Sequence, residues 1–374
     1  MRGLFFVAVA LLCLWGCGGG EKTGSSGEVL FRLSDSVSVR LKTGQIKKGR
    51  DLVILNEGED IVLTLVREGI YSVPVFGGSV YGDWGGDGSF RGVWVDSLRG
   101  AGYRVPLEAH PTLLGQPCED EKKPFVYETS LGLLVGEEYC DSVRGTILTP
   151  TGDYRYLTGT KGGGELCLNT FDGAHLFCFK ARVKGDSLVG GAFFSGTHYV
   201  SDVWSGVRVS RPEVGWSSKQ APDLSSSVDV LGVDPFNLLD SLGQKLLVVD
   251  ILGTWCPNCY DEVRLLKSLE GLYPDVAFMS VAFERGDSAS AYRRISQFKN
   301  QLGISWPILY GGPADKSHAD SVVSFLGGVK SFPTTAFISS NGEVVVHTGF
   351  NGPATPYYSE EVDFYKSTIE SFIE

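Results

Sequence analysis

The chain is short of positive charge and of histidine, and each shortage removes a class of function. Its 374 residues carry 33 Lys and Arg against 44 Asp and Glu, a formal net charge of −11. Because neutralising a phosphate backbone needs clustered cations, this balance argues against nucleic acid as a partner. The five histidines show no spacing typical of a zinc site, so we expect no metal and no cofactor.

The first apolar run is too short to span a membrane. It covers residues 4–15 after Arg2, whereas a spanning helix needs about 20 apolar residues, so it predicts a secretory signal. The run ends at Leu14-Trp15-Gly16-Cys17, which resembles a bacterial lipobox and implies a lipid on Cys17. We therefore expect a signal peptide and lipobox over 1–17 and a flexible tether over 18–27. A plain signal peptide with an ordinary Cys17 is the alternative.

Residues 28–215 show no long helix periodicity and are predicted to form a mainly antiparallel β domain. In SVSVRLKTG, apolar Val37, Val39 and Leu41 alternate with polar residues, as in a half-buried strand. The segment 164–196 predicts a three-strand meander whose first turn is a two-residue Asp172-Gly173 hairpin. A stretch rich in Pro, Ser and Gly then marks a boundary near 211–225.

Residues 216–374 follow a different pattern. Short apolar runs such as KLLVVDIL (245–252) alternate with segments whose apolar residues recur at helical spacing, and a hairpin and a last helix close the chain. This order predicts an α/β domain in which a mixed sheet carries helices on both faces.

Four of the eight cysteines lie in the β-rich half. In a secreted protein an even set predicts two disulfides. Counting outward from the Asp172-Gly173 turn places Cys167 directly opposite Cys178. The predicted pairs are Cys167–Cys178 and Cys118–Cys140. Free buried cysteines are the alternative.

The remaining pair, Cys256 and Cys259, lies in GTWCPNC between a predicted strand and a predicted helix. A metal site or a structural bridge is possible, but the junction favours redox cycling, since a helix N-terminus stabilises a thiolate. Cys256, at the first position, is expected to be the more exposed and to attack a substrate disulfide. Cys259, one turn inside the helix, would resolve the mixed disulfide.

Two carboxylates are candidates for the proton acceptor in that resolving step. Glu262 lies three residues after Cys259, on the same helix face, although a solvated helix residue is the alternative. Asp250 lies in the apolar strand, where burial should raise its pKa toward neutrality, although a structural role is the alternative. Trp255 is expected to cover one side of the pair or to pack in the core.

VVDILGTWCPNCYDE, followed by SFPTTAFISSNGEVV, resembles the thioredoxin superfamily and, more closely, its TlpA/ResA-like membrane-tethered thiol–disulfide oxidoreductases. The similarity covers roughly 220–374 and implies a thioredoxin-like fold. It implies that Cys256 is the nucleophile and Cys259 the resolving thiol. It also implies that Pro333 is a cis-proline beside the pair and that Glu262 is the active-site glutamate. Asp250 instead matches the buried aspartate of thioredoxin itself, and the preceding β domain resembles extensions of such lipoproteins in Bacteroidetes-type bacteria.

The resemblance implies a lipid-anchored enzyme on the periplasmic side of the envelope that reduces disulfides of exported proteins. Apocytochrome c is one such substrate, and a membrane electron donor would recharge the enzyme. One alternative is a peroxiredoxin-like thiol peroxidase, although that family's Thr or Ser position is occupied here by Gly253. Another is a surface lipoprotein whose β domain binds a partner or glycan. Aromatic residues that could line such a site are Trp84, Trp94, Trp204 and Trp216.

Overall fold

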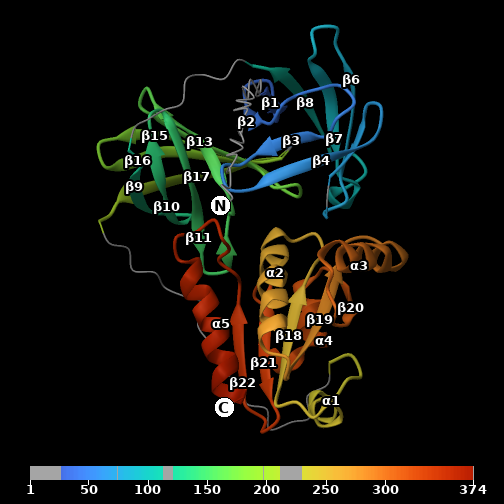
Figure 1. Ribbon diagram of the computed structural model, residues 1–374. Coiled ribbons are helices and arrows are strands. Elements are labelled where there is room, and N and C mark those ends of the chain that lie inside the picture. The colour runs from blue at the N-terminus through green and yellow to red at the C-terminus, as the bar shows by residue number, and fades with distance from the viewer. Residues whose placement is uncertain (1–26, 74, 113–120, 197, 211–229, 374) are drawn as a thin grey trace, which may run out of the picture.

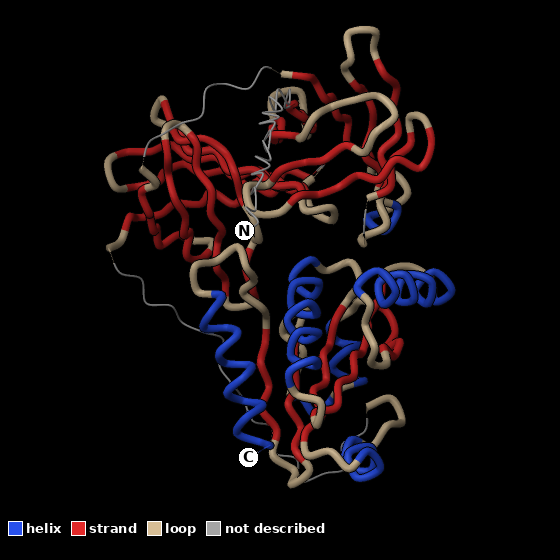
Figure 2. The backbone as a smooth tube through the Cα atoms, viewed as in Figure 1, coloured by secondary structure: helices blue, strands red, loops and turns tan. Residues whose placement is uncertain are grey.

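The computed structural model describes residues 27–73, 75–112, 121–196, 198–210 and 230–373. These residues form three sheets, two of them antiparallel and one mixed (Figures 1 and 2). The predicted mainly antiparallel structure of the first half is confirmed for the described residues. This β-rich half forms two separate sheets rather than a single sheet. The predicted boundary at 215/216 lies outside the described residues and stays a prediction.

The first sheet is a closed eight-stranded barrel, in which β1 pairs with both β2 and β8. Alternate residues such as Val29, Phe31 and Val39 are fully buried, as the period of two requires. A short 3₁₀ helix η1 (Ser97–Arg99) precedes the last strand. The strands are β1 (Gly27–Arg32), β2 (Ser38–Thr43), β3 (Leu52–Leu55), β4 (Asp60–Arg67), β5 (Ile70–Ser72), β6 (Ser79–Trp84), β7 (Phe90–Val95) and β8 (Arg104–Pro111).

The second sheet has nine strands in the order β10-β9-β17-β16-β15-β14-β13-β11-β12. It packs against the barrel through Phe171, whose ring stacks on Phe31 and whose carbonyl accepts a hydrogen bond from Asn56 at 2.8 Å. The strands are β9 (Lys123–Thr129), β10 (Gly132–Tyr139), β11 (Ser142–Thr149), β12 (Gly152–Asp153), β13 (Leu157–Gly162), β14 (Glu165–Phe171), β15 (Leu176–Lys184), β16 (Ser187–Ser195) and β17 (His198–Arg208).

The meander β14–β15–β16 is confirmed, but the predicted register of its first hairpin is wrong. The Asp172 carboxylate accepts hydrogen bonds from the N–H groups of Ala174 and His175, so the turn takes four residues instead of two. Cys178 consequently lies opposite Asn169, and not opposite Cys167.

Cys167 and Cys178 are free thiols in the structure, which corrects the predicted bridge between them. A hydrogen bond from the Cys178 thiol lowers the pKa of Cys167 to about 7, and the same contact raises the pKa of Cys178. Cys140 is disulfide-bonded. Cys118 lies outside the described residues, so the Cys118–Cys140 pairing stays a prediction.

The third sheet has five strands in the order β20-β19-β18-β21-β22, with β18, β19 and β20 parallel and the last two antiparallel. Helices α2, α3 and α5 pack on one face, while α1 and α4 pack on the other. The strands are β18 (Leu246–Leu252), β19 (Val276–Glu284), β20 (Ile308–Pro313), β21 (Thr334–Ser339) and β22 (Val344–Thr348). The helices are α1 (Pro235–Leu242), α2 (Pro257–Leu272), α3 (Ser288–Leu302), α4 (Lys316–Val322), η2 (Ser324–Leu326) and α5 (Tyr358–Ile373).

The third sheet directs the start of α2 toward the two antiparallel sheets (Figure 1). Strand β18 is buried at all seven positions and ends just before GTWCPNC, so the cysteine pair sits where the strand gives way to the helix. No helix among the described residues has both the length and the apolar character needed to cross a membrane.

Candidate active site

The first turn of α2 holds the cysteine pair. Cys256 is the N-cap, with extended backbone angles, and its sulfur accepts a hydrogen bond from the Cys259 N–H at 3.3 Å. Pro257 occupies the first helical position, where its missing N–H costs nothing. The helix thus directs unpaired N–H groups and its positive end at the Cys256 sulfur.

The two thiols differ in their access to solvent. Cys256 is 7% exposed and Cys259 is fully buried. The Cys256 sulfur also lies 3.5 Å from the carbonyl oxygen of Phe332, and the peptide bond from Phe332 to Pro333 is cis. Burial raises the pKa of Cys259 well above its usual value. The thiol that can meet another molecule is therefore Cys256.

Asp250 and Glu262 lie side by side beneath the pair, both buried. The Glu262 carboxylate accepts hydrogen bonds from Thr335 at 2.6 Å and from the Tyr365 hydroxyl. Asp250 accepts one from Ser280 at 3.1 Å. The alternative that Glu262 is a solvated helix residue is wrong.

One proton shared between these carboxyl groups would satisfy the two carboxyl oxygens that otherwise have no hydrogen-bond partner. Asp250 Oδ1 and Glu262 Oε2 have no other partner, and two ionised carboxylates in contact would repel each other. Burial raises the pKa of Asp250 well above its usual value, and the charge of Glu262 raises it further. Burial also raises the pKa of Glu262, although its hydroxyl donors oppose that rise. We infer that Asp250 is protonated and donates a hydrogen bond to the ionised Glu262, so the two carboxyl groups act as one unit.

The rim beside Cys256 is aromatic and basic. Trp255 donates its indole N–H to the Phe283 carbonyl at 2.9 Å and packs edge-on against Phe332. The guanidinium of Arg285 lies 4.0 Å above the Trp255 ring. Trp255 therefore packs, partly buried, against the core of this sheet and beneath Arg285, while its role in covering one side of the cysteine pair stays a prediction.

Thr254 is turned away from the cysteine pair. Its N–H and its hydroxyl donate to the two carboxylate oxygens of Glu284, each at 2.8 Å. The hydroxyl is therefore not free to assist a peroxide at Cys256, which weighs against the peroxidase alternative.

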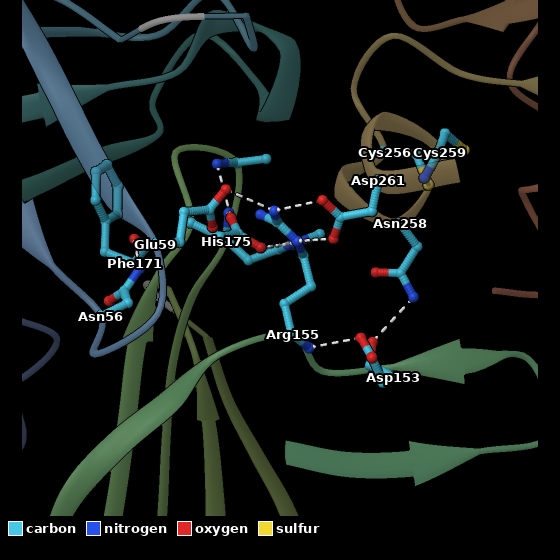
Figure 3. A network of polar contacts seen from close by, with 12 residues as sticks. Asn56, Glu59, Asp153, Arg155, Phe171, His175, Cys256, Asn258, Cys259 and Asp261 are labelled. Carbon is cyan, nitrogen blue, oxygen red and sulfur yellow. Dashed lines mark hydrogen bonds and ion pairs between the residues drawn. The ribbon is translucent and has the colours of Figure 1, made fainter. Parts of the chain in front are cut away.

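The antiparallel sheets also reach helix α2, through residues that sequence reasoning missed (Figure 3). Arg155, which follows β12, forms an ion pair with Asp261 of α2 at 2.8 Å. Asn258, between the cysteines, donates to the carbonyl of Asp153 at 3.0 Å. No local pattern distinguishes these residues, because each acquires its partner from a segment about 100 positions away.

The buried carboxyl of Asp153 makes the stability of this contact depend on pH. Burial raises the pKa of Asp153 to about 7, against about 3.9 in an unfolded chain. Between these values the folded chain keeps a proton that the unfolded chain has lost, so stability falls as pH rises and the loss is complete above about 7. For each pH unit between the two pKa values, the free energy of unfolding falls by about 1.4 kcal/mol.

We therefore expect Asp153→Asn to gain stability relative to the wild type between pH 5 and pH 8. Urea unfolding of both proteins at the two pH values measures this, and other titrating groups cancel in the difference. An identical difference at pH 5 and pH 8 would contradict the account.

The remaining candidates do not converge on a second site. Trp94 and Trp204 are fully buried in the two cores, Trp84 packs against the barrel core, and Trp216 lies outside the described residues. The possible lipidation site Cys17 also lies outside them. The described residues hold no group of three His, Cys, Asp or Glu side chains suited to a metal ion.

Comparisons with known proteins find relatives for part of the chain. No family model matches. The thioredoxin-like protein YneN of Bacillus subtilis is 28% identical over 143 residues, 37% of this chain and 76% of that protein. The thiol-disulfide oxidoreductase ResA of Halalkalibacterium halodurans is 30% identical over 112 residues, 30% of this chain and 58% of that protein.

Two solved structures are similar to about a third of the chain. The dsbF protein of MTB shares 21% identity and covers 36% of this chain and 84% of its own, with a TM-score of 0.27. A putative thiol:disulfide interchange protein DsbE from Chlorobium tepidum shares 19% identity and covers 36% and 85%, with a TM-score of 0.28. Part of the chain is thus similar in sequence to a thioredoxin-like protein and to a thiol-disulfide oxidoreductase.

Proposed function

We propose that Cys256 and Cys259 cycle between dithiol and disulfide and reduce disulfides in exported proteins. The Cys256 thiolate attacks one sulfur of the substrate disulfide, that S–S bond breaks, and one substrate thiolate leaves. Cys259 then attacks the Cys256 sulfur and releases the second substrate thiolate, so the enzyme keeps the disulfide. The observation that carries this proposal is the Cys256 sulfur at the α2 N-cap, 3.3 Å from the Cys259 N–H.

The carboxyl pair supports the resolving step. Burial holds Cys259 protonated, so it needs a base before it can attack. Asp250 holds the proton that it shares with Glu262, so the pair carries a single negative charge near the Cys259 thiol. This pair can accept the Cys259 proton without exposing a charge to solvent.

The segment at Phe332 and Pro333 supports a place for the substrate chain. The Phe332 carbonyl already accepts a contact from Cys256 at 3.5 Å, and the strand β21 begins just after Pro333. An extended substrate can therefore bond to the backbone of Phe332 while its disulfide meets Cys256. Trp255 and Arg285 form the neighbouring wall.

We place this activity on the periplasmic side of the envelope, with the protein anchored by lipid on Cys17. The signal-like segment 1–17 and the predicted tether 18–27 support this location. Exported proteins with disulfides, apocytochrome c among them, would be the substrates. A membrane electron donor would return the pair to the dithiol form.

Insulin reduction tests the proposal. With dithiothreitol as electron source, the wild-type protein should speed precipitation of the insulin B chain well above the uncatalysed rate. The Cys256→Ser variant should not raise the rate above the uncatalysed one, because the attacking sulfur is gone. The Cys167→Ser variant should behave like the wild type. A wild-type rate no faster than that of Cys256→Ser would refute the reductase.

A further inference from the structure

Arg155 joins three parts of the molecule at one buried guanidinium (Figure 3). Its side chain is 2% exposed. It donates twice to Asp261 of α2, at 2.8 and 3.0 Å, and once to Glu59 of the barrel at 2.7 Å. Since Arg155 itself follows β12, the barrel, the nine-stranded sheet and the redox helix meet at this side chain.

A second contact holds the residue between the two cysteines. The Asn258 amide donates to the carbonyls of Asp153 at 3.0 Å and Phe350 at 3.2 Å. The Asp153 carboxylate in turn accepts the Gly352 N–H at 2.8 Å. The first turn of α2 is thus bonded directly to the backbone of the nine-stranded sheet.

The nine-stranded sheet and the third sheet with its helix α2 approach each other so closely that their backbones are in contact. Gly152 has φ of +122°, and a Cβ there would lie 2.5 Å from the Asn258 amide nitrogen and 2.9 Å from the Phe350 carbonyl oxygen. A Cβ on Gly349 would lie 2.5 Å from the carbonyl carbon of Thr151. A side chain at position 152 would push the sheet off helix α2, and one at position 349 would push the sheet off the loop that follows β22.

We propose that Arg155 is a positioning residue for the redox pair, through which the N-terminal β structure sets the reduction potential of Cys256–Cys259. This rests on the dithiol–disulfide cycle proposed above. The role is electrostatic as well as mechanical. Arg155 neutralises Asp261, which lies five residues after Cys256, about 7.5 Å further along the helix axis.

Loss of the Arg155 charge and loss of the Asp261 charge should shift the reduction potential in opposite directions. The form of reduced Cys256 that attacks a disulfide is the negatively charged thiolate, whereas the Cys256–Cys259 disulfide is neutral. Without Arg155, the uncompensated Asp261 carboxylate repels the thiolate and disfavours the reduced form. Without the Asp261 charge, Arg155 attracts the thiolate and favours it. Buried charges interact strongly because little water screens them.

The test is the equilibrium of the full-length protein with glutathione at pH 7, in which the enzyme disulfide plus two glutathione thiols gives the enzyme dithiol plus glutathione disulfide. Arg155→Met should lower the equilibrium constant about fivefold, and Asp261→Asn should raise it about fivefold. These changes correspond to about 20 mV in each direction. The double variant should return close to the wild-type value.

Arg144→Met is the matched control, because Arg144 also makes a two-point contact with a carboxylate of the same sheet, Glu137, but both side chains of that pair are partly exposed. It should leave the potential unchanged. If Arg155→Met does not fold, Asp261→Asn against Asp261→Glu still tests the sign, since Glu keeps the charge.

Shifts of the single variants in the same direction would mean that the contact is merely structural and would overturn the inference. Potentials equal to the wild type would overturn it as well. A wild-type pair with no measurable reversible couple would instead refute the proposed function itself, and the inference with it.

Discussion

A Cys259→Ser variant is expected to accumulate as a mixed disulfide with its substrate. Cys256 would still attack, because its sulfur keeps the α2 N-cap and its place beside Phe332. The second step would fail, because no thiol remains one helical turn away to attack the bond. Non-reducing electrophoresis followed by mass spectrometry of exported proteins captured on the variant should show nearly complete trapping.

The Cys256→Ser/Cys259→Ser double variant is the control and should trap nothing. Trapping should also be absent after treatment with dithiothreitol, which reduces the mixed disulfide. If Cys256→Ser traps substrate through Cys259 as well as Cys259→Ser does through Cys256, the assigned order of the two thiols is wrong. The trapped proteins would also identify the substrates.

The second large effect is expected at the carboxyl pair. Asp250→Asn and Glu262→Gln should each slow the resolving step about a hundredfold, the scale of general base catalysis. Because the two carboxyls share one proton and act together, the double variant should be little slower than the slower single variant. The rate at which the mixed disulfide resolves, followed by quenched alkylation, measures this.

The pH dependence gives a further check on the pair. Burial raises the pKa of Glu262, so the wild-type resolving rate should fall as pH drops through that raised pKa and no acceptor remains. Asp275→Asn and Glu360→Gln remove exposed carboxylates and should leave both rate and profile unchanged. For the Asp250→Asn/Glu262→Gln double variant, a slowing equal to the product of the two single effects would show that the two carboxyl groups act independently.

The sequence pattern was sufficient for the parts of the site that are local. The apolar run of β18, the helix period of α2 and the Cys-x-x-Cys spacing place Cys256 at an N-cap and Glu262 beneath it. The carboxyl pair could be suspected for the same reason, since both residues lie within a few positions of the cysteines. The sequence could not predict that the two carboxyl groups act as one unit, because this depends on the contact between strand β18 and helix α2.

Contacts between distant segments could not be predicted. The Cys167–Cys178 pairing failed because Asp172 binds two N–H groups and lengthens the turn, which moves Cys178 opposite Asn169. Arg155 carries no local signal, since its two partners come from the barrel and from α2. The division of the β-rich half into a barrel and a nine-stranded sheet likewise depends on which strands pair around the barrel.

The reduction potential of the Cys256–Cys259 couple distinguishes a reductase from an oxidase. It is obtained from the fraction of dithiol in the full-length protein across a series of glutathione ratios at pH 7. A reductase predicts a single two-electron transition with a potential near the roughly −270 mV of thioredoxin. A value near the roughly −120 mV of a strong oxidant such as DsbA, or no reversible transition at these two cysteines, would contradict it.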